Sequence, residues 1–323
     1  MASSKSFVRR PASEGRRRWW IVALGLFLVF DIALVAFALN ANSRPTATAD
    51  RSSVEPASPS TALTPSATPT PSATSTSSVA PVVAVPQRLL AAVNGDVAWR
   101  GVVGACSDGS SELEYTADGG ATWNVADPAP ATGATALVRV VPESSSEANV
   151  VTLDAECSPQ LVGTFVAGDA WEDYSSNIGS YWYIDPADRA KVHSPGGTVA
   201  APCDSAVAIA TRSSSEALVL CANQTLFETT TSGAEWSSAI NVPGVVAVAG
   251  SEDGYVVAVV AQGECAAASI VALSGETASV PRGCFGEEVT AGQTALAVAD
   301  DGTMWLWADE RIARSDDGGT TWA

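Results

Sequence analysis

The chain has little with which to bind metal ions or nucleic acid. His193 is its only histidine and none of its six cysteines forms a C-x-x-C pair, so the usual ligand spacing of a zinc site is missing from the sequence. Basic residues are scarce from position 83 onward, where nine basic and 31 acidic side chains give a net charge of −22. An acidic domain repels a phosphate backbone. We therefore expect no metal ion, no cofactor and no nucleic acid partner.

Long apolar runs are also rare, and the one that is present lies near the start of the chain. Residues 19–39 form an apolar stretch of 21 residues, long enough as a helix to cross a bilayer core of about 30 Å. Its thirteen Leu, Ile, Phe and Val residues favour insertion by about 4–8 kcal/mol, more than the roughly 2.5–3.5 kcal/mol that Asp31 costs. This balance predicts a transmembrane helix that acts as a signal anchor.

The basic residues of the segment 1–18 predict a cytoplasmic tail, because positive charge stays inside. The chain would then be a single-pass protein of the plasma membrane with its C-terminal part extracytoplasmic. A cleaved signal peptide is the alternative, since Ala36-Phe37-Ala38 fits a small-x-small cleavage site.

Residues 40–80 are rich in Ser, Thr, Pro and Ala and contain too few apolar residues to offset the entropy of ordering. They predict a disordered linker, either bearing O-linked sugars or unmodified. Residues 81–323 are different, because short β-rich runs alternate there with Gly, Asp and Ser turns. Strong helix signals are lacking, so we expect an all-β domain.

Four segments of this domain align on one frame: "TADGGATW" (116–123), "TFVAGDAW" (164–171), "TTTSGAEW" (229–236) and "SDDGGTTW" (315–322). The first and last fit S/T-x-D-x-G-x-T-W, which resembles the Asp-box, or BNR repeat, of sialidase-like β-propellers. The resemblance covers residues 81–323 and implies a ring of small four-stranded sheets. It implies a structural role for eight residues: Asp118, Gly120, Trp123, Trp171, Trp236, Asp317, Gly319 and Trp322.

Each role has a physical basis. Asp118 and Asp317 can accept backbone N–H bonds inside a tight turn. The glycines allow a positive φ, and the tryptophans can pack between neighbouring sheets. Reading backward from these four turns and from a fifth, weaker copy at 273–280 ("LSGETASV") gives five sets of strands, the last without an outer strand, and thus predicts a five-bladed β-propeller. We expect residues 81–86 to complete the fifth blade by pairing beside Arg311–Ser315.

All six cysteines lie beyond the apolar run, where the environment is oxidising, so they predict disulfide bonds. Blade geometry places them on the face opposite the Asp-boxes. Neighbours along the chain then suggest the pairs Cys106–Cys157, Cys203–Cys221 and Cys265–Cys284. Six cysteines allow 15 connectivities, so other pairings stay open.

The longest connection, 173–204, lies on the same face and is the candidate binding loop. Long loops and clustered aromatic residues often carry function, although the same residues can also cover a neighbouring blade. The candidate residues are Tyr181, Trp182, Tyr183, Asp185, Asp188, Lys191 and His193.

A sialidase-like activity implies an arginine cluster, a Tyr–Glu nucleophile pair and an F/Y-R-I-P motif before the first box, and no such motif precedes Thr116. Arg139 lies on a predicted inner strand, but no catalytic residue can be assigned. We expect a non-catalytic binding or scaffold module for a protein or cell-envelope glycan, and whether it is an enzyme stays open. The alternatives are a divergent glycosidase and an assembly factor for an envelope complex.

Overall fold

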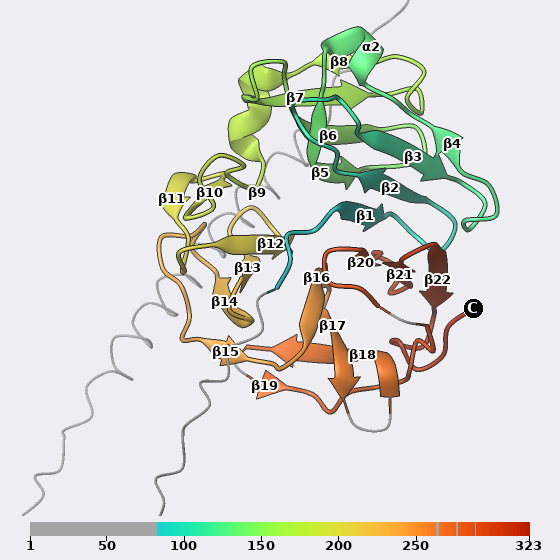
Figure 1. Cartoon of the computed structure of the whole chain (residues 1–323), viewed down its shortest axis with the longest axis vertical. Coiled ribbons are helices and arrows are strands. Elements are labelled where there is room, and N and C mark those ends of the chain that lie inside the picture. Colours follow the sequence, from blue (N-terminus) through green and yellow to red (C-terminus); the bar gives the residue numbers. More distant parts are fainter. Residues whose placement is uncertain (1–82, 263–264, 276, 288) are drawn as a thin grey trace, which may run out of the picture. The chain divides into compact units, whose positions relative to one another are not determined.

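The computed structural model describes residues 83–323 except 263–264, 276 and 288, and these residues belong to one compact unit, Ser75–Ala323. They form six antiparallel sheets that follow one another along the chain and stand side by side in a ring (Figure 1). The domain is therefore a six-bladed β-propeller. The predicted tail, transmembrane helix and linker lie outside the described residues, and no helix within the described part is long and apolar enough to cross a membrane.

Four blades have four strands and two have three. The four-stranded blades are blade 1 (β1 Arg88–Ala92, β2 Ala98–Val102, β3 Glu112–Thr116, β4 Asn124–Val125), blade 2 (β5 Ala136–Pro142, β6 Ala148–Leu153, β7 Pro159–Thr164, β8 Glu172–Asp173), blade 4 (β12 Ala206–Thr211, β13 Ala217–Cys221, β14 Thr225–Thr229, β15 Ile240–Asn241) and blade 5 (β16 Val245–Ser251, β17 Gly254–Gln262, β18 Cys265–Ser274, β19 Thr277–Ala278). The three-stranded blades are blade 3 (β9 Tyr183–Ile184, β10 Lys191–Ser194, β11 Gly197–Ala200) and blade 6 (β20 Thr294–Val298, β21 Met304–Ala308, β22 Arg311–Ser315). Two short helices, α2 (Ala129–Thr132) and η1 (Ser175–Ser180), connect elements at the edges of blades.

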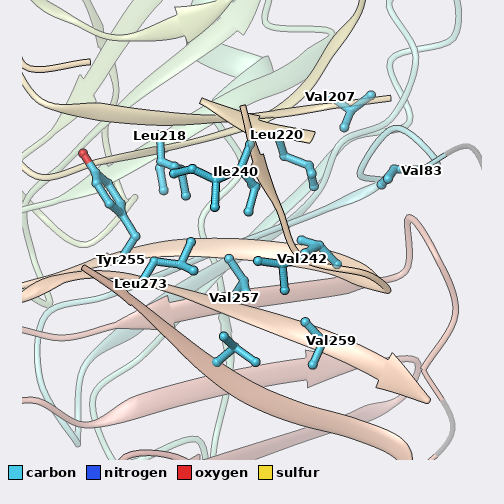
Figure 2. Packing of buried hydrophobic residues seen from close by; sticks show 14 residues of the cluster. Val83, Val207, Leu218, Leu220, Ile240, Val242, Tyr255, Val257, Val259 and Leu273 are labelled. Atoms are coloured by element: carbon cyan, nitrogen blue, oxygen red, sulfur yellow. The ribbon is translucent and has the colours of Figure 1, made fainter. Parts of the chain in front are cut away.

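The first strand of each blade lies innermost, and these six strands surround the centre of the ring. The ring closes because β1 lies against β20 and β21, the strands of the last blade. Neighbouring blades bury apolar side chains between them. Between blades 4 and 5, for example, Leu218 and Leu220 of β13 face Val257 and Val259 of β17 (Figure 2).

The Asp118 turn is held by its own side chains. Asp118 accepts hydrogen bonds from the Thr122 amide (2.9 Å) and hydroxyl (2.6 Å), and Thr116 Oγ1 accepts one from the Gly120 amide (2.9 Å). The Asp317 turn repeats the pattern with Ser315, Gly319 and Thr321. These hydrogen bonds, led by the Thr122 hydroxyl at one turn and the Thr321 amide at the other, lower the pKa of each aspartate to about 2.

The two segments without an aspartate at the third position keep part of this pattern. In blade 4 the Thr231 hydroxyl takes the place of the carboxylate and accepts a hydrogen bond from the Glu235 amide (2.9 Å), while Thr229 accepts one from the Gly233 amide (3.0 Å). In blade 2 the corresponding bond from the Gly168 amide to Thr164 remains (2.9 Å). A hydroxyl at the first position is therefore the part of the turn that all four segments share.

The tryptophan after each turn contacts the preceding blade, as the sequence predicts for a residue between sheets. Three of these contacts are edge-to-face pairs with centroid separations of 6.4, 6.5 and 5.7 Å, namely Trp123–Trp305, Trp171–Trp99 and Trp322–Phe285. In blade 4 the indole N–H of Trp236 instead donates to the Ala200 carbonyl of blade 3 (3.2 Å). The first pair joins blade 1 to blade 6 and so spans the closure of the ring.

A second set of indoles points to the following blade. Each N–H donates to a backbone carbonyl of the next blade's first hairpin turn, in the pairs Trp99–Ser144 (3.0 Å), Trp182–Ser213 (3.1 Å) and Trp305–Asn94 (3.1 Å). The three donors are almost completely buried, with exposed fractions of 0%, 4% and 0%. Because a buried indole N–H needs an acceptor, these bonds fix the angle between neighbouring sheets.

The predicted count of five blades is wrong. Segment 173–204, interpreted from sequence as a long connection, contains all three strands of blade 3. Its strands are only two to four residues long, too short for the alternation that marks a strand, and its turn at Ser194 lacks the Asp-box pattern.

The predicted pairing of residues 81–86 beside Arg311–Ser315 is also wrong for residues 83–86, which the structure describes. The Val83 amide donates to the Ala222 carbonyl of blade 4 (2.8 Å), far from β22. The outer side of β22 is instead taken by the last residue, because Ala323 and Arg314 exchange two backbone hydrogen bonds (2.9 and 3.1 Å). From Val83 onward, the ring thus closes through side chains and hairpin turns, without a strand shared between its first and last blades.

Three disulfides connect the pairs that blade geometry suggests, with Cα–Cα distances of 5.7 Å for Cys106–Cys157, 6.3 Å for Cys203–Cys221 and 5.5 Å for Cys265–Cys284. All six cysteines lie in or beside connections between second and third strands or between blades. We call this side of the ring the disulfide face. The opposite side, which carries the Asp118 and Asp317 turns, is the Asp118 face.

We expect Trp305→Ala to lower the free energy of unfolding by about 3–5 kcal/mol. The indole is fully buried, contacts Trp123 and donates to Asn94, so its loss opens a cavity at the ring closure. Urea unfolding followed by tryptophan fluorescence measures the change. Val280→Ala, at a side chain that is 81% exposed, is the control and should stay within about 0.5 kcal/mol. A similar small change for Trp305→Ala would contradict its role in closure.

The low pKa values of Asp118 and Asp317 predict a stability loss in acid. Each carboxylate has a pKa near 2 in the folded protein and about 3.9 in the unfolded chain. This difference stabilises the fold above about pH 4, and the stabilisation is lost as the pH falls toward 2. We therefore expect the double variant Asp118→Asn/Asp317→Asn to melt at a lower temperature than wild type near neutral pH. Melting scans across this window should show the two proteins converging as pH falls. A constant difference throughout would contradict the assignment.

Candidate functional site

The seven candidate binding residues lie in or next to blade 3, although they do not form one surface. Trp182 and Tyr183 are buried, with exposed fractions of 4% and 5%. Trp182 contacts blade 4 through its bond to Ser213, and Tyr181 packs on the other side against the cluster that contains Val151 of blade 2. Two aromatic residues of the predicted cluster therefore serve contacts between blades.

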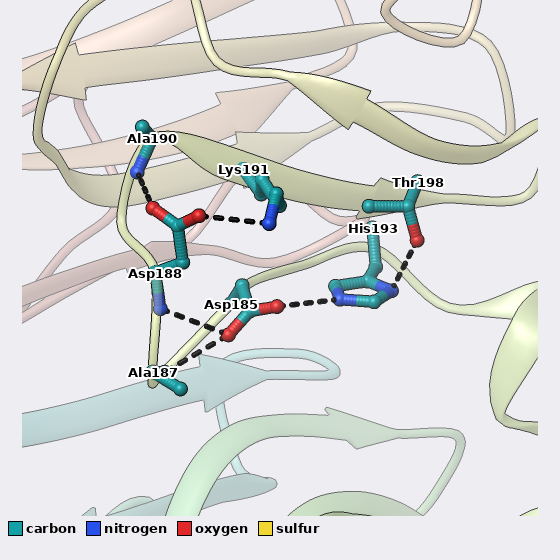
Figure 3. Close-up of polar contacts among 7 residues, drawn as sticks. All are labelled: Asp185, Ala187, Asp188, Ala190, Lys191, His193 and Thr198. Carbon is teal, nitrogen blue, oxygen red and sulfur yellow. Dashed lines mark hydrogen bonds and ion pairs between the residues drawn. The ribbon is translucent and has the colours of Figure 1, made fainter.

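Asp185 and His193 form a hydrogen-bonded group with residues around them (Figure 3). One Asp185 oxygen accepts from the amides of Ala187 (2.9 Å) and Asp188 (3.0 Å), and the other lies 3.2 Å from His193 Nε2. Burial raises the pKa of Asp185, but the hydrogen bonds from His193 and from the two amides outweigh it, so the pKa lies below its usual value. The carboxylate thus fixes the turn between β9 and β10.

The His193 ring is held on three sides. Besides Asp185, its Nδ1 lies 3.0 Å from the Thr198 hydroxyl of β11, and its face stacks on Tyr183 with centroids 4.2 Å apart. Asp188 and Lys191 form a separate ion pair at 2.8 Å in which both side chains are about half exposed. The structure therefore brings together Tyr183, Asp185 and His193, with Lys191 beside them at the surface. Their role in binding stays a prediction.

A cavity of about 520 Å³ lies at the centre of the ring, lined by the innermost strands of all six blades. Most of its wall is aliphatic, from residues such as Val140, Ile209 and Leu296. Tyr183 and Ile184 of blade 3 also line it, so part of the predicted loop does reach a cavity. Concave, mostly apolar sites with a few polar groups are the usual form of a binding site.

Arg139 is the charged group in the middle of this wall. It lies on β5 at a β-bulge, where the register shifts between Leu137 and Arg139. Its Nη2 donates to the Thr211 hydroxyl of blade 4 (2.6 Å), and no carboxylate of the described residues forms an ion pair with it. Burial lowers the pKa of Arg139 to about 10, which leaves the guanidinium charged at neutral pH.

Arg88 and Arg189 also border the cavity. Arg189 contacts the opposite end of β12 from Arg139. The Arg189 guanidinium donates to the Ala206 carbonyl at the first residue of β12 (3.1 Å), whereas Arg139 reaches Thr211 at the last. At about 3.3 Å per residue the two acceptors are roughly 16 Å apart. Arg88 donates to the Asp309 carbonyl of blade 6. The cluster of converging arginines that a sialidase-like site implies is therefore not formed by Arg139 and Arg189.

The chain enters the domain across the disulfide-face end of the cavity. Residues 83–87, the N-terminal strap, begin with the Val83 bond to Ala222 and end with the Gln87 amide donating to Gly292 of the segment before blade 6 (2.7 Å). Val85 and Pro86 between these anchors line the cavity. A ligand would therefore approach Arg139 from the Asp118 face.

Sequence reasoning placed Arg139 on an inner strand but did not identify Thr211 or the cavity. The available signal was an arginine inside the run "ALVRVV", where every neighbour is apolar. The partner could not be found from sequence, because Thr211 lies 72 positions away on a blade that is not adjacent.

No family model and no curated protein matches the sequence. Several solved structures are similar in fold. AofleA from Arthrobotrys oligospora is 10% identical with a TM-score of 0.49, over 76% of this chain and 86% of that one. A variant of the Aleuria aurantia lectin in complex with Fucα1-6GlcNAc is 11% identical with a TM-score of 0.45, over 76% and 96%. YCF48 bound to D1 peptide is 18% identical with a TM-score of 0.28, over 76% and 67%. At these values the ligands of those proteins say nothing about the ligand of this chain.

We expect Asp185→Asn to lower the free energy of unfolding by about 1–2 kcal/mol, because charged hydrogen bonds to two amides and His193 are weakened. Asp188→Asn is the matched control, since its ion pair with Lys191 is half exposed and it accepts from a single amide, that of Ala190 (3.2 Å), so its effect should be much smaller. Urea unfolding measures both. Equal effects of the two variants would contradict a special role for the Asp185 carboxylate in blade 3.

Proposed function

We propose that this chain is a membrane-tethered, extracytoplasmic propeller that binds a protein or a cell-envelope glycan without chemical turnover. The apolar run 19–39 and the Ser/Thr/Pro-rich segment 40–80 support tethering at a distance from the membrane. The three disulfides support an oxidising compartment. The observation that carries the binding role is the central cavity with the charged, single-bonded Arg139 in its wall.

A guanidinium offers five N–H donors in one plane, and the described protein groups accept from one of them in Arg139. Water in the cavity can accept hydrogen bonds from the other N–H groups. An acidic group of a ligand would pair with the charge of Arg139 and displace that water. The ligand that fits best therefore presents a carboxylate, as an acidic side chain, a peptide C-terminus or a uronic acid does. Carboxylates of this kind occur in proteins and in cell-envelope glycans alike.

Crosslinking in intact cells, followed by capture of the full-length chain, tests the proposal. A partner or glycan that crosslinks to wild type and not to Arg139→Met would support binding at the cavity. Arg282→Met is the control, because it removes the same charge from an exposed position on blade 5. Turnover of a fluorogenic glycoside that Arg139→Ala abolishes would contradict the non-catalytic part of the proposal and favour a divergent glycosidase.

A binding role for Arg139 also makes a prediction about stability. Burying a charge with one hydrogen bond is costly, and an apolar residue of similar volume often restores the loss. We expect Arg139→Met to raise the free energy of unfolding by about 1 kcal/mol or to leave it unchanged, while the captured ligand is lost. Urea unfolding of the two proteins measures this. A loss of about 3 kcal/mol or more would mean that Arg139 supports the fold instead.

A further inference from the structure

Blade 1 carries charged residues where other blades have their apolar core. The residue that pairs with the first Thr or Ser of each turn gives a common register: Ala98 with Thr116, Ala148 with Thr164, Ala217 with Thr229 and Met304 with Ser315. Two positions further along the second strand, blades 2, 4 and 6 have fully buried aliphatic residues, Val150, Val219 and Leu306. Blade 1 has Arg100 at this position.

The next strand shows the same replacement. Arg100 lies opposite Glu114, whereas Val150 lies opposite Val162 and Leu306 opposite Ala313, both buried. Arg100 and Glu114 form an ion pair through Nε and Nη2, both 2.7 Å from Glu114 Oε2. Their side chains remain 22% and 28% exposed, so this part of the sheet face reaches solvent.

The guanidinium groups alternate with aromatic rings across the boundary between blades 1 and 6. Arg100 lies 4.3 Å from the ring centroid of Trp123 and 5.3 Å from that of Trp307, and Arg88 lies 4.5 Å from Trp307. Stacking of this kind holds the planar groups rigidly. The arginine heads are therefore placed in advance of any binding event.

A pocket of about 280 Å³ opens beside this stack, which we call the blade 1–6 pocket. Beyond the two arginines and Trp307, it is lined by four carboxylates, Glu112, Glu114, Asp309 and Glu310. Within the described part of the chain, both contacts from Arg100 use Oε2 of Glu114, and no donor is paired with Oε1. The pocket thus presents carboxylate acceptors next to rigid guanidinium donors.

We propose that the blade 1–6 pocket binds a neutral saccharide unit. Hydroxyl groups on adjacent carbons can donate to the Glu114 carboxylate and accept from the Arg100 guanidinium at the same time, which a mixed lining of this kind favours. Four carboxylates against two guanidiniums repel an anionic ligand, and the two guanidiniums oppose a cation placed next to them. The site differs from the cavity at Arg139 in position and in the charge of the ligand that it accepts, so it goes beyond the function proposed above.

The experiment uses the full-length chain in a detergent without a sugar head group. Saturation-transfer NMR is recorded with the methyl glycosides of glucose, galactose, mannose and fucose, and tryptophan fluorescence follows each titration. The test variant is Arg100→Leu/Glu114→Val, which gives blade 1 the residue types of the other blades and is expected to fold. The matched control is Arg311→Leu/Glu287→Val, which removes an ion pair at 2.6 Å whose arginine also lies near an aromatic ring, Phe285.

We expect at least one glycoside to bind wild type saturably, the test variant to lose at least about tenfold in affinity, and the control variant to bind as wild type does. Glu114→Gln, which keeps the shape and removes the charge, should weaken binding and gives a second readout if the double variant misfolds. Arg139→Met should bind the glycoside normally, which separates this site from the cavity. Binding of none of the four glycosides across the millimolar range would overturn the proposal. So would unchanged affinity in both pocket variants, or binding of putrescine in place of the glycosides.

Discussion

The contact of a tryptophan with the neighbouring blade is the constraint on which this ring depends. Small sheets that stand side by side have no covalent or strand-to-strand connection at their flat faces, so their relative angle must be set by side chains. Here one set of indoles packs back on the preceding blade and another donates forward to a hairpin carbonyl. Both sets occur at the boundary between blades 1 and 6, through Trp123 and Trp305. The ends of the domain are thus joined by the same means as blades 1 and 2 and blades 3 and 4, whereas blades 4 and 5 meet through aliphatic side chains and Tyr255.

The sequence was informative where a residue type has only one favourable conformation. Asp118 and Asp317 predicted their turns, because a carboxylate in a tight turn can accept hydrogen bonds from amides and hydroxyls of that turn. The disulfide pairs followed from the position of each cysteine relative to those turns. Blade 3 was missed for the opposite reason. Its inner strand has two residues, Tyr183 and Ile184, and is specified by contacts with β5 and β12 that are distant in sequence.

The candidate site was predictable only in part. Tyr183 and His193 do lie together and Tyr183 does reach the cavity, but Trp182 belongs to a contact between blades. Charge at a position that is otherwise apolar is the feature shared by Arg139, Arg100 and Glu114. The neighbours of Arg139 in the sequence are apolar, and other blades have apolar residues where blade 1 has Arg100 and Glu114. The second comparison requires the strand register, which the sequence does not provide. Such residues lower stability unless they are paired, stacked or hydrated. Arg100 and Glu114 are paired and stacked, and Arg139 has one hydrogen bond, so both proposed sites start from this feature.

The N-terminal strap has a mechanical consequence. A force applied at Val83 acts on hydrogen bonds to Ala222 of blade 4 and to Gly292 before blade 6, two points that belong to different parts of the ring. A tensile load is therefore divided between blades instead of peeling one outer strand from the edge of the ring. Val83 itself is buried among residues of blades 4 and 5, including Val207 and Val259 (Figure 2), so extraction must break an apolar contact as well. Rupture under force is governed by the rate of unfolding, and release of this anchorage is the first step of that process.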